Sequence, residues 1–491
     1  MIARRSVLKS TVVLGILTFA GTLPGLRAVA QATPPLRRSL QGMDLDDPVL
    51  ITLRDFVQMM SDPSRAGEPV NWLRFSEIHG DAGGFNLCPH GNWYFLPWHR
   101  GYIRSYEVVA RALTGDAGFA MPYWDWTAQP DFPAAFGDAT FDGNPNPLFV
   151  PGRAMTTGDA MDPAITGQAV MDSIFAKQTY EEFGSSRATG QNSTDPSWIS
   201  ARGTQGELES NPHNNVHCDV FGPFMCSGAS PLDPIFQMHH ANIDHIWANW
   251  VAQGRSNSTN PMWLDMPFTD NFINPDGSNY SDVVKDLLDV EPLGYTYGLG
   301  TSPTLPPVDP GRDLYLAQLY GAPLGLSALV SSRMIETVNK QALPDAPLNL
   351  TLRSAGMNIG RLVSKDTSMA LELAGQSKQT VYAFIRKLDP VDHESTRLRV
   401  FINEPEANAE TQTAGNPHYV TTIGFFGPAG MHGDMDMRSN VAVDLTPALR
   451  QLSDAGMLAT DNISVQLVPV RSASEAAPAP VGLVEIELAV V

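Results

Sequence analysis

Six histidines in two clusters are the residues of this chain best suited to do chemistry. The first cluster is His79, His90 and His99, and the second is His213, His217 and His240. No carboxylate or thiolate stands at the matching positions, and sets of three imidazoles suit a copper ion that cycles between Cu(I) and Cu(II). Two such sets predict a dinuclear centre with two copper ions, and therefore chemistry with dioxygen.

Helical periodicity explains how several of these histidines can face a common point. His99 repeats with Ile103 and Tyr106 along one stripe, which predicts that it lies on the inward face of an amphipathic helix. His213 and His217 are four residues apart, so they project from one helix face and can hold one metal ion.

The remaining helix signals concern the second cluster. Asn211 is predicted to cap a helix whose first residue is Pro212. His240 shares a stripe with Phe236, whereas the adjacent His239 lies on a stripe of its own, and periodicity does not choose between the two histidines. Four helices that each offer imidazoles to one centre are a known way to build a metal site inside a bundle.

Three segments carry a family resemblance. FLPWHRGYIRSYE, MPYWDWT and DPIFQMHHANIDHIW resemble the copper motifs of the type 3 copper family, which contains tyrosinases, catechol oxidases (polyphenol oxidases) and hemocyanin functional units. The resemblance is close over roughly residues 45 to 260 and looser beyond them. It makes the second histidine of the pair, His240, the copper ligand and leaves His239 as a packed neighbour.

The resemblance implies a copper oxidase of phenols. The expected reaction is oxidation of an o-diphenol to an o-quinone by dioxygen, together with hydroxylation of monophenols, a monooxygenase activity. A catechol oxidase or o-aminophenol oxidase that lacks monophenolase activity is the rival enzyme. Oxygen binding of the hemocyanin kind is the rival from another class, and an open gate region and an export leader disfavour it.

Further site residues follow from the same resemblance. Glu209 and Asn214 match a pair that holds a water and deprotonates a monophenol, which is general-base work; the alternative is that Glu209 favours a helix N-terminus and Asn214 lies at the surface. Ser227 or Gly228 stands where several catechol oxidases have a gating phenylalanine, so a small residue here predicts an open pocket.

Four other residues are expected near the copper ions. Phe95 and Phe236 each precede a ligand by four residues and are expected to pack the helices around the site. Asp244 is expected to accept a hydrogen bond from an imidazole. The pattern Cys88-Pro-His90 implies a thioether between the cysteine sulfur and the histidine ring, the alternative being a small buried thiol.

The other two cysteines are Cys218 and Cys226. They can pair only if their β-carbons approach closely enough, which the sequence does not show.

Composition changes along the chain predict its organisation. Residues 1–32 read as a secretory leader of the twin-arginine type, and 33–300 as a mainly α catalytic domain, a four-helix bundle that holds the dinuclear copper site. Residues 301–345 form a proline-rich connector. Residues 346–491 carry short β-branched runs that predict an antiparallel β-sandwich. In relatives such a domain covers the copper pocket with a side chain, and the sequence does not identify that side chain.

The chain is strongly acidic. A formal charge of −20 over 491 residues argues against nucleic acid and anionic membranes as partners. It predicts some repulsion of anionic substrates such as phenolic acids, the alternative being that the acidity serves solubility alone; the expected substrates are small phenols and dioxygen. Leader cleavage would leave an exported protein, periplasmic or extracellular, without stable membrane association. The sequence leaves the natural substrate and the oligomeric state open.

Overall fold

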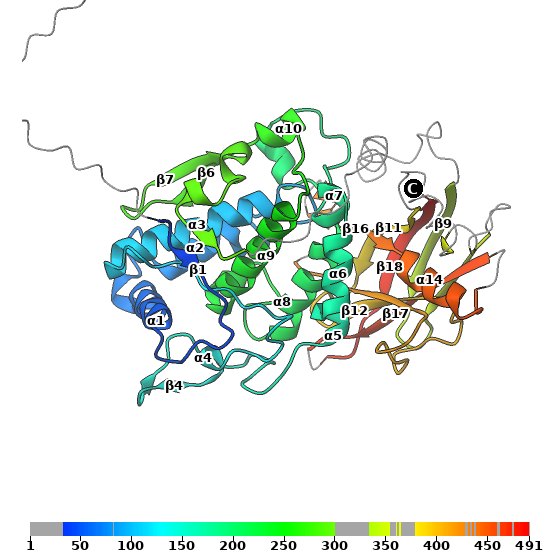
Figure 1. Cartoon of the computed structure of the whole chain (residues 1–491), viewed down its shortest axis with the longest axis horizontal. Helices are drawn as coiled ribbons and strands as arrows, with labels where there is room; N and C mark the ends of the chain where they lie inside the picture. Colours follow the sequence, from blue (N-terminus) through cyan, green and yellow to red (C-terminus); the bar gives the residue numbers. More distant parts are fainter. Residues whose placement is uncertain are drawn as a thin grey trace, which may run out of the picture. The chain divides into compact units, whose positions relative to one another are not determined.

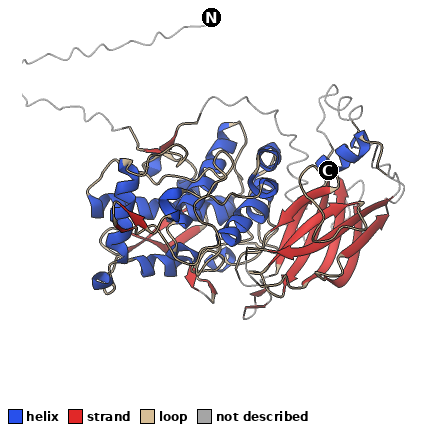
Figure 2. Ribbon diagram, turned by 90° about the horizontal axis from the view of Figure 1, so that it is seen from below, coloured by secondary structure: helices blue, strands red, loops and turns tan. Residues whose placement is uncertain are grey.

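The structure is a computed structural model. It describes residues 33–81, 83–299, 333–353, 360, 363–364, 379–427, 431–432, 435–436, 438–458, 462–473 and 476–490. Residues 35–491 belong to one compact unit. We call residues 35–299 the helical region and residues 333–490 the sheet region (Figure 1). Figure 2 shows the helices gathered in the first and long strands in the second.

The helical region contains ten α-helices among its described residues. They are α1 Pro48–Ser61, α2 Trp72–His79, α3 Phe95–Thr114, α4 Ala134–Gly137, α5 Pro163–Thr166, α6 Gln168–Ala176, α7 Tyr180–Phe183, α8 Asn214–Val220, α9 Ile235–Ala252 and α10 Pro261–Leu264. A π-helical turn, Glu209–His213, leads directly into α8. Short 3-10 turns lie at Pro63–Arg65, Pro196–Ile199, Ser230–Leu232, Val284–Leu287 and Glu291–Leu293.

Short strands complete this region. They are β1 Leu36–Arg37, β2 Gly80–Asp81, β3 Gly84–Phe85, β4 Thr140–Phe141, β5 Asn144–Pro145, β6 Pro267–Ile273, β7 Asn279–Val283 and β8 Thr296–Tyr297. All pair as antiparallel hairpins except β1 and β8, which pair in parallel. The β1–β8 pair joins the beginning of the helical region to its end.

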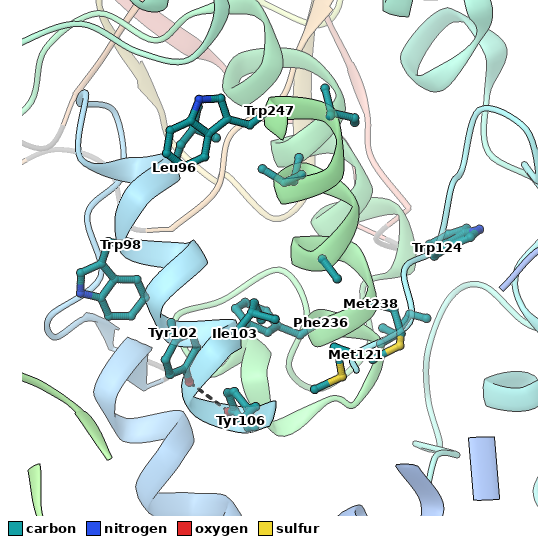
Figure 3. Close-up of a cluster of buried hydrophobic side chains, with 14 of the residues drawn as sticks. Leu96, Trp98, Tyr102, Ile103, Tyr106, Met121, Trp124, Phe236, Met238 and Trp247 are labelled. Carbon is teal, nitrogen blue, oxygen red and sulfur yellow. Dashed lines mark hydrogen bonds between the residues drawn. The ribbon is translucent and has the colours of Figure 1, made fainter. Parts of the chain in front are cut away.

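Helices α3 and α9 form the centre of the helical region. Side chains from both meet in one apolar cluster, with Leu96 beside Trp247 at one end and Ile103 near Phe236 at the other, so the helices run antiparallel (Figure 3). Helix α3 ends at Gly115, whose φ of 74° closes the helix in the left-handed conformation. Each helix carries one predicted copper ligand toward the other.

A buried ionic network fixes the same two helices. Arg37 of β1 donates to Glu107 of α3 and to Asp244 of α9, each over 2.8 Å, and Arg100 of α3 donates to the other oxygen of Asp244 over 2.5 Å. Tyr295 adds a hydrogen bond to Asp244 over 2.7 Å. Because these groups are buried, loss of Arg37 would leave the Glu107 carboxylate without its paired cation, at a cost of about 3–5 kcal/mol.

The sheet region consists mainly of two four-stranded antiparallel sheets. Their orders are β10-β17-β12-β13 and β16-β11-β18-β9. The strands are β9 Arg333–Ala342, β10 Leu348–Arg353, β11 Val381–Pro390, β12 Thr396–Ile402, β13 Tyr419–Ile423, β14 Met431–His432, β15 Met435–Asp436, β16 Ser439–Asp444, β17 Asn462–Arg471 and β18 Val481–Val490, with helix α14 at Thr446–Asp454. Apolar side chains of both sheets share one core.

Polar contacts join the two regions. Lys177 of the helical region pairs with Asp444 over 3.0 Å and with Glu207 over 2.8 Å. Arg397 of β12 pairs with Asp219 of α8. Burial by itself lowers the pKa of the Lys177 amine, but the carboxylates of Asp444 and Glu207 outweigh it and raise the pKa above the usual range, so this contact stays charged at neutral pH.

Two sequence predictions about organisation can be compared with the structure, and two others lie outside it. The leader, residues 1–32, and residues 301–332 of the predicted proline-rich connector lie outside the described residues. The helix predicted to start at Pro212 with Asn211 as its cap begins earlier, because Glu209 already lies in the π-helical turn. Strand β9 lies inside the predicted connector, residues 301–345, so the sheet region starts earlier than predicted. In its sequence, RMIETVNKQA, apolar and polar residues alternate too weakly to predict a strand. In the part of the chain that the structure describes, no helix has both the length and the apolar character needed to cross a membrane.

Candidate metal centre

The two histidine clusters of the sequence are two groups of neighbouring buried side chains in the structure. One group is His79, Cys88, His90 and His99, and the other is His213, His217, His239 and His240; within each group the potential ligand atoms lie within 4.8 Å of one another. The segments that supply the histidines are α2, the loop before α3, α3 itself, the π-helical turn, α8 and α9.

The inner ring nitrogens face each other in both groups. The Nε2 atoms of His217 and His240 are 3.2 Å apart, and those of His79 and His90 are 3.5 Å apart. Nε2 of His213 is buried and has no hydrogen-bond partner among the described side chains. Buried nitrogens in such positions need a shared partner, and a cation bound by their lone pairs meets that need. The residues present therefore fit copper.

Fixed oxygen atoms hold the outer nitrogens of four of the six predicted ligands. The Nδ1 partners are Gly228 O for His79 at 2.7 Å, Phe95 O for His99 at 2.7 Å, Met225 O for His217 at 2.8 Å and Asn214 Oδ1 for His213 at 2.9 Å. A carbonyl oxygen only accepts, so each of these imidazoles carries its proton on Nδ1. That tautomer leaves the Nε2 lone pair free for a metal ion.

Burial keeps the imidazoles neutral. It lowers the pKa of His79 to about 4 and the pKa of His213 to about 3, and lowers the pKa of the other four predicted ligands well below the usual value. Neutral imidazole is the form that binds a metal ion, so the centre is ready for one at neutral pH.

The two groups adjoin each other. The rings of His99 and His240 stack with centroids 4.2 Å apart and an interplanar angle of 11°, and those of His90 and His213 stack at 5.4 Å. This geometry therefore fits one site for two neighbouring metal ions better than two separate sites.

The positions of His239 and His240 only partly decide which of the two is the copper ligand. His240 turns its Nε2 toward that of His217, 3.2 Å away. His239 packs against Trp126 at 4.9 Å and stacks on His213 at 5.3 Å, within reach of the same group. The assignment of His240 as the ligand stays a prediction that substitution can test.

The two predicted phenylalanines lie among the ligands. The ring of Phe95 is 4.8 Å from that of His99 and 4.6 Å from that of His213. The ring of Phe236 is 4.2 Å from that of His240 and 5.1 Å from that of His79. Each phenylalanine thus touches both clusters and limits how far the imidazoles can move.

Glu209 lies beside the first cluster. Its carboxylate accepts from the backbone N–H of Gly91 over 2.6 Å and from the hydroxyl of Ser185, and one oxygen is 3.5 Å from Nδ1 of His90. Burial raises the pKa of Glu209 to about 7. A carboxyl group with that pKa can exchange a proton near neutral pH.

Asn214 is engaged on both sides. Its Oδ1 accepts from His213, and its Nδ2 donates to Gly424 O of the sheet region over 3.0 Å. It is buried rather than at the surface, which excludes the alternative considered for it.

The observed contacts of Asp244, Gly228 and Ser227 differ from what the sequence predicted. Asp244 bonds the buried arginines and tyrosines described above instead of an imidazole, because the guanidinium groups occupy its oxygens. Gly228 uses its carbonyl to hold His79, and a Cβ here would lie 2.2 Å from Gly84 O. The hydroxyl of Ser227 donates to Phe224 O over 2.8 Å. The small residues at the predicted gate serve close packing.

Two aromatic rings that the sequence did not reveal cover the centre. Phe426, just after β13, stacks on His217 with centroids 3.9 Å apart and an interplanar angle of 17°. Phe85 of β3 stacks on His90 at 4.2 Å, and the two phenylalanine rings are 5.3 Å apart. The pocket predicted to be open is therefore closed by aromatic side chains.

Glycines flank Phe426 and permit its approach. A Cβ on Gly424 would lie 2.8 Å from the backbone of Asn215, and one on Gly427, whose φ is 77°, would lie 2.1 Å from the ring of Phe85. We call residues 424–427 the cover segment. The sequence Gly-Phe-Phe-Gly favours this close approach, but the hydrophobic pattern alone does not reveal it.

Two family models match the chain. One is described as the common central domain of tyrosinase and matches residues 69–202 and 158–253; the other is a domain of unknown function, DUF7868, and matches residues 357–487. Tyrosinase HcTyr1 of Hahella sp. (strain CCB-MM4) is 28% identical over 425 residues, which cover 79% of this chain and 81% of that protein. Polyphenol oxidase D, chloroplastic, of Solanum lycopersicum is 28% identical over 454 residues, which cover 84% of this chain and 70% of that protein.

Solved structures share the fold. That of latent aurone synthase (polyphenol oxidase) from natural source aligns with a TM-score of 0.63 and 19% identity, over 94% of this chain and 90% of that one. That of latent apple tyrosinase aligns with a TM-score of 0.61 and 18% identity, over 93% of this chain and 98% of that one.

All six predicted ligands lie within the residues matched by the tyrosinase domain. With the paired imidazole clusters, this match makes residues 69–253 a domain of the tyrosinase kind. The matches of the chain as a whole are to oxidoreductases, the tyrosinases and polyphenol oxidases.

Substitution of the two adjacent histidines tests the ligand assignment. Purified His240→Ala protein should hold about one copper ion instead of about two, because the second cluster loses a donor. His239→Ala, the matched control, should keep about two. Copper per chain is measured by atomic absorption after desalting. Two bound ions in the His240→Ala protein, with one in the His239→Ala protein, would reverse the assignment.

Proposed function

We propose that this protein oxidises o-diphenols to o-quinones with dioxygen, using a dinuclear copper centre, and also hydroxylates monophenols. The observation that carries the proposal is the convergence of six buried, neutral imidazoles within a tyrosinase domain. Bound copper would supply dioxygen binding and electron transfer.

The protein's own residues have three tasks in this reaction. The carbonyl-bonded imidazoles hold the metal ions in fixed positions. Phe95 and Phe236 confine those rings and exclude water from the space between the clusters. Glu209, with its raised pKa, can take the hydroxyl proton of a monophenol, and Asn214 can orient the water through which it passes.

The cover segment opposes this reaction while it is seated. Phe426 lies on His217, where a flat phenol ring would have to approach, and Gly424 O occupies the amide of Asn214. We propose that the sheet region keeps the enzyme latent through this segment, and that displacement of the segment frees both the pocket and Asn214.

A second candidate function is reversible oxygen binding without phenol oxidation. The closed aromatic cover favours it, since dioxygen is far smaller than a phenol. A catechol oxidase or o-aminophenol oxidase is the rival among enzymes. These three functions are separated by assaying copper-loaded protein with tyrosine and with L-DOPA, before and after displacement of the cover segment.

Two further proposals concern maturation. Arg4 and Arg5 before an apolar run support export by the twin-arginine route, which carries folded proteins with their cofactors. Cys88 is a buried free thiol whose Sγ lies 3.1 Å from Nε2 of His90, which supports a thioether to that ring. Its formation joins sulfur to a ring carbon, and dioxygen takes up the two hydrogens and two electrons.

Substitution of Phe426 tests latency. Phe426→Ala should raise L-DOPA oxidation at least about tenfold, because loss of a buried phenylalanine removes more than about 2 kcal/mol from the closed arrangement. Val420→Ala, in the half-buried part of β13, is the control and should leave the rate unchanged. The rate is normalised to bound copper. An unchanged rate for a copper-loaded Phe426→Ala protein would reject latency by this side chain.

Asn214 tests the monophenolase proposal. In the Phe426→Ala background, Asn214→Ala should lower tyrosine hydroxylation by about a hundredfold and L-DOPA oxidation much less, because only the first step needs the positioned base. Asn214→Asp keeps the oxygen that His213 needs, and serves to check copper content. Equal losses on both substrates would show that Asn214 supports copper binding alone.

Mass spectrometry tests the thioether. After copper loading in air, the peptide that contains Cys88 and His90 should be lighter by about two mass units than the unmodified peptide, the loss of two hydrogens. Protein kept without copper is the control and should show the unmodified mass. A Cys88 thiol that is alkylated after denaturation of fully active protein would contradict the bond.

A further inference from the structure

The disulfide between Cys218 and Cys226 lies at the second histidine cluster. Cys218 follows His217 directly, and Cys226 follows Met225 directly. Nδ1 of His217 donates to the carbonyl oxygen of Met225 over 2.8 Å. The disulfide therefore joins the immediate neighbours of the donor and of the acceptor, and closes the loop between them.

The disulfide acts together with two other contacts of this loop: the Met225 side chain is buried in the apolar core, and the backbone N–H of Ser227 donates to Phe224 O. Helix α8 ends at Val220. The next residue, Phe221, has a φ of 49°, a backbone conformation that residues other than glycine rarely adopt. A covalent link across this loop reduces the number of positions that the carbonyl can take. Orientation of an imidazole by its outer hydrogen bond strongly affects the metal affinity of the inner nitrogen.

The same disulfide supports the cover segment. Sγ of Cys218 lies 3.3 Å from the carbonyl oxygen of Phe425, and both cysteines pack in one apolar cluster with Phe426. Phe426 in turn stacks on His217. One face of this ligand is thus bounded by the cover, and its outer nitrogen by the disulfide loop.

We propose that the Cys218–Cys226 disulfide is a positioning element for the second copper ion. It holds Met225 O against His217 and so keeps Nε2 of this ligand directed at the metal. The inference rests on the proposed function only in taking copper as the metal. Breakage of the disulfide should selectively weaken the binding of one of the two metal ions. His217 of the second cluster bonds Met225 O inside the loop 218–226, whereas His79 of the first cluster bonds Gly228 O, which lies outside that loop.

Chelator titration of the double variant Cys218→Ala/Cys226→Ala tests the inference. Wild-type and variant proteins are loaded with Cu(I) without oxygen and titrated with a Cu(I) chelator. The variant should release one copper ion at a chelator concentration at least about tenfold lower than wild type, and the other at an unchanged concentration. After oxidation in air, the half-depleted variant should show the EPR signal of an isolated Cu(II) ion, which a bridged pair does not give.

Asp219→Asn is the matched control. Asp219 lies on the same helix and pairs with Arg397 of the sheet region, so this variant loosens a contact between the regions but keeps the disulfide. It should release copper as wild type does. If the double alanine variant does not fold, Cys218→Ala with Cys226→Val, which restores apolar volume, takes its place.

The outcomes separate this inference from the proposed function. Wild-type protein that binds no copper would contradict both. Wild-type protein with two copper ions, and a folded variant that keeps both with unchanged affinity, would overturn the inference alone. Simultaneous loss of both ions from the variant would also overturn it, because the disulfide would then act on the whole fold rather than on His217.

Discussion

The structure depends on one constraint: each histidine at the centre must be neutral and must point its inner nitrogen at a shared space. Burial provides the neutrality, since it lowers the pKa of these rings far below neutral pH. Oxygen acceptors provide the direction, and three of the four named above are backbone carbonyls. Backbone acceptors carry no charge and cannot rotate away, so they orient a ring without competing for the metal.

The helices are held in place by charges of a different kind. Arg37, Glu107 and Asp244 tie the first strand to α3 and α9, the helices that bring His99 and His240 into a stack. This network is one helical turn away from His240 along α9. The charged groups of this network bond one another and Tyr295 rather than the predicted ligands; the carboxyl group that lies beside a ligand is that of Glu209, 3.5 Å from Nδ1 of His90.

Sequence patterns predicted which histidines gather in two groups, because the motifs are local. His213 and His217 lie four residues apart, and their shared helix face follows from that spacing alone. The change from helices to strands was also readable, although β9 begins inside the predicted connector; the bundle and the sandwich stay predictions. Contacts between distant segments were not readable. Nothing near Gly228 in the chain indicates His79, and nothing near Phe426 indicates His217.

The parallel pairing of β1 with β8 has a consequence for how the chain could be rearranged. Leu36 lies opposite Thr296, so the two ends of the helical region are hydrogen-bonded neighbours. A region whose ends are neighbours is well suited to circular permutation, in which the old ends are fused and new ends are opened in a surface loop. A permuted helical region could display its metal centre on a chain with no sheet region at all.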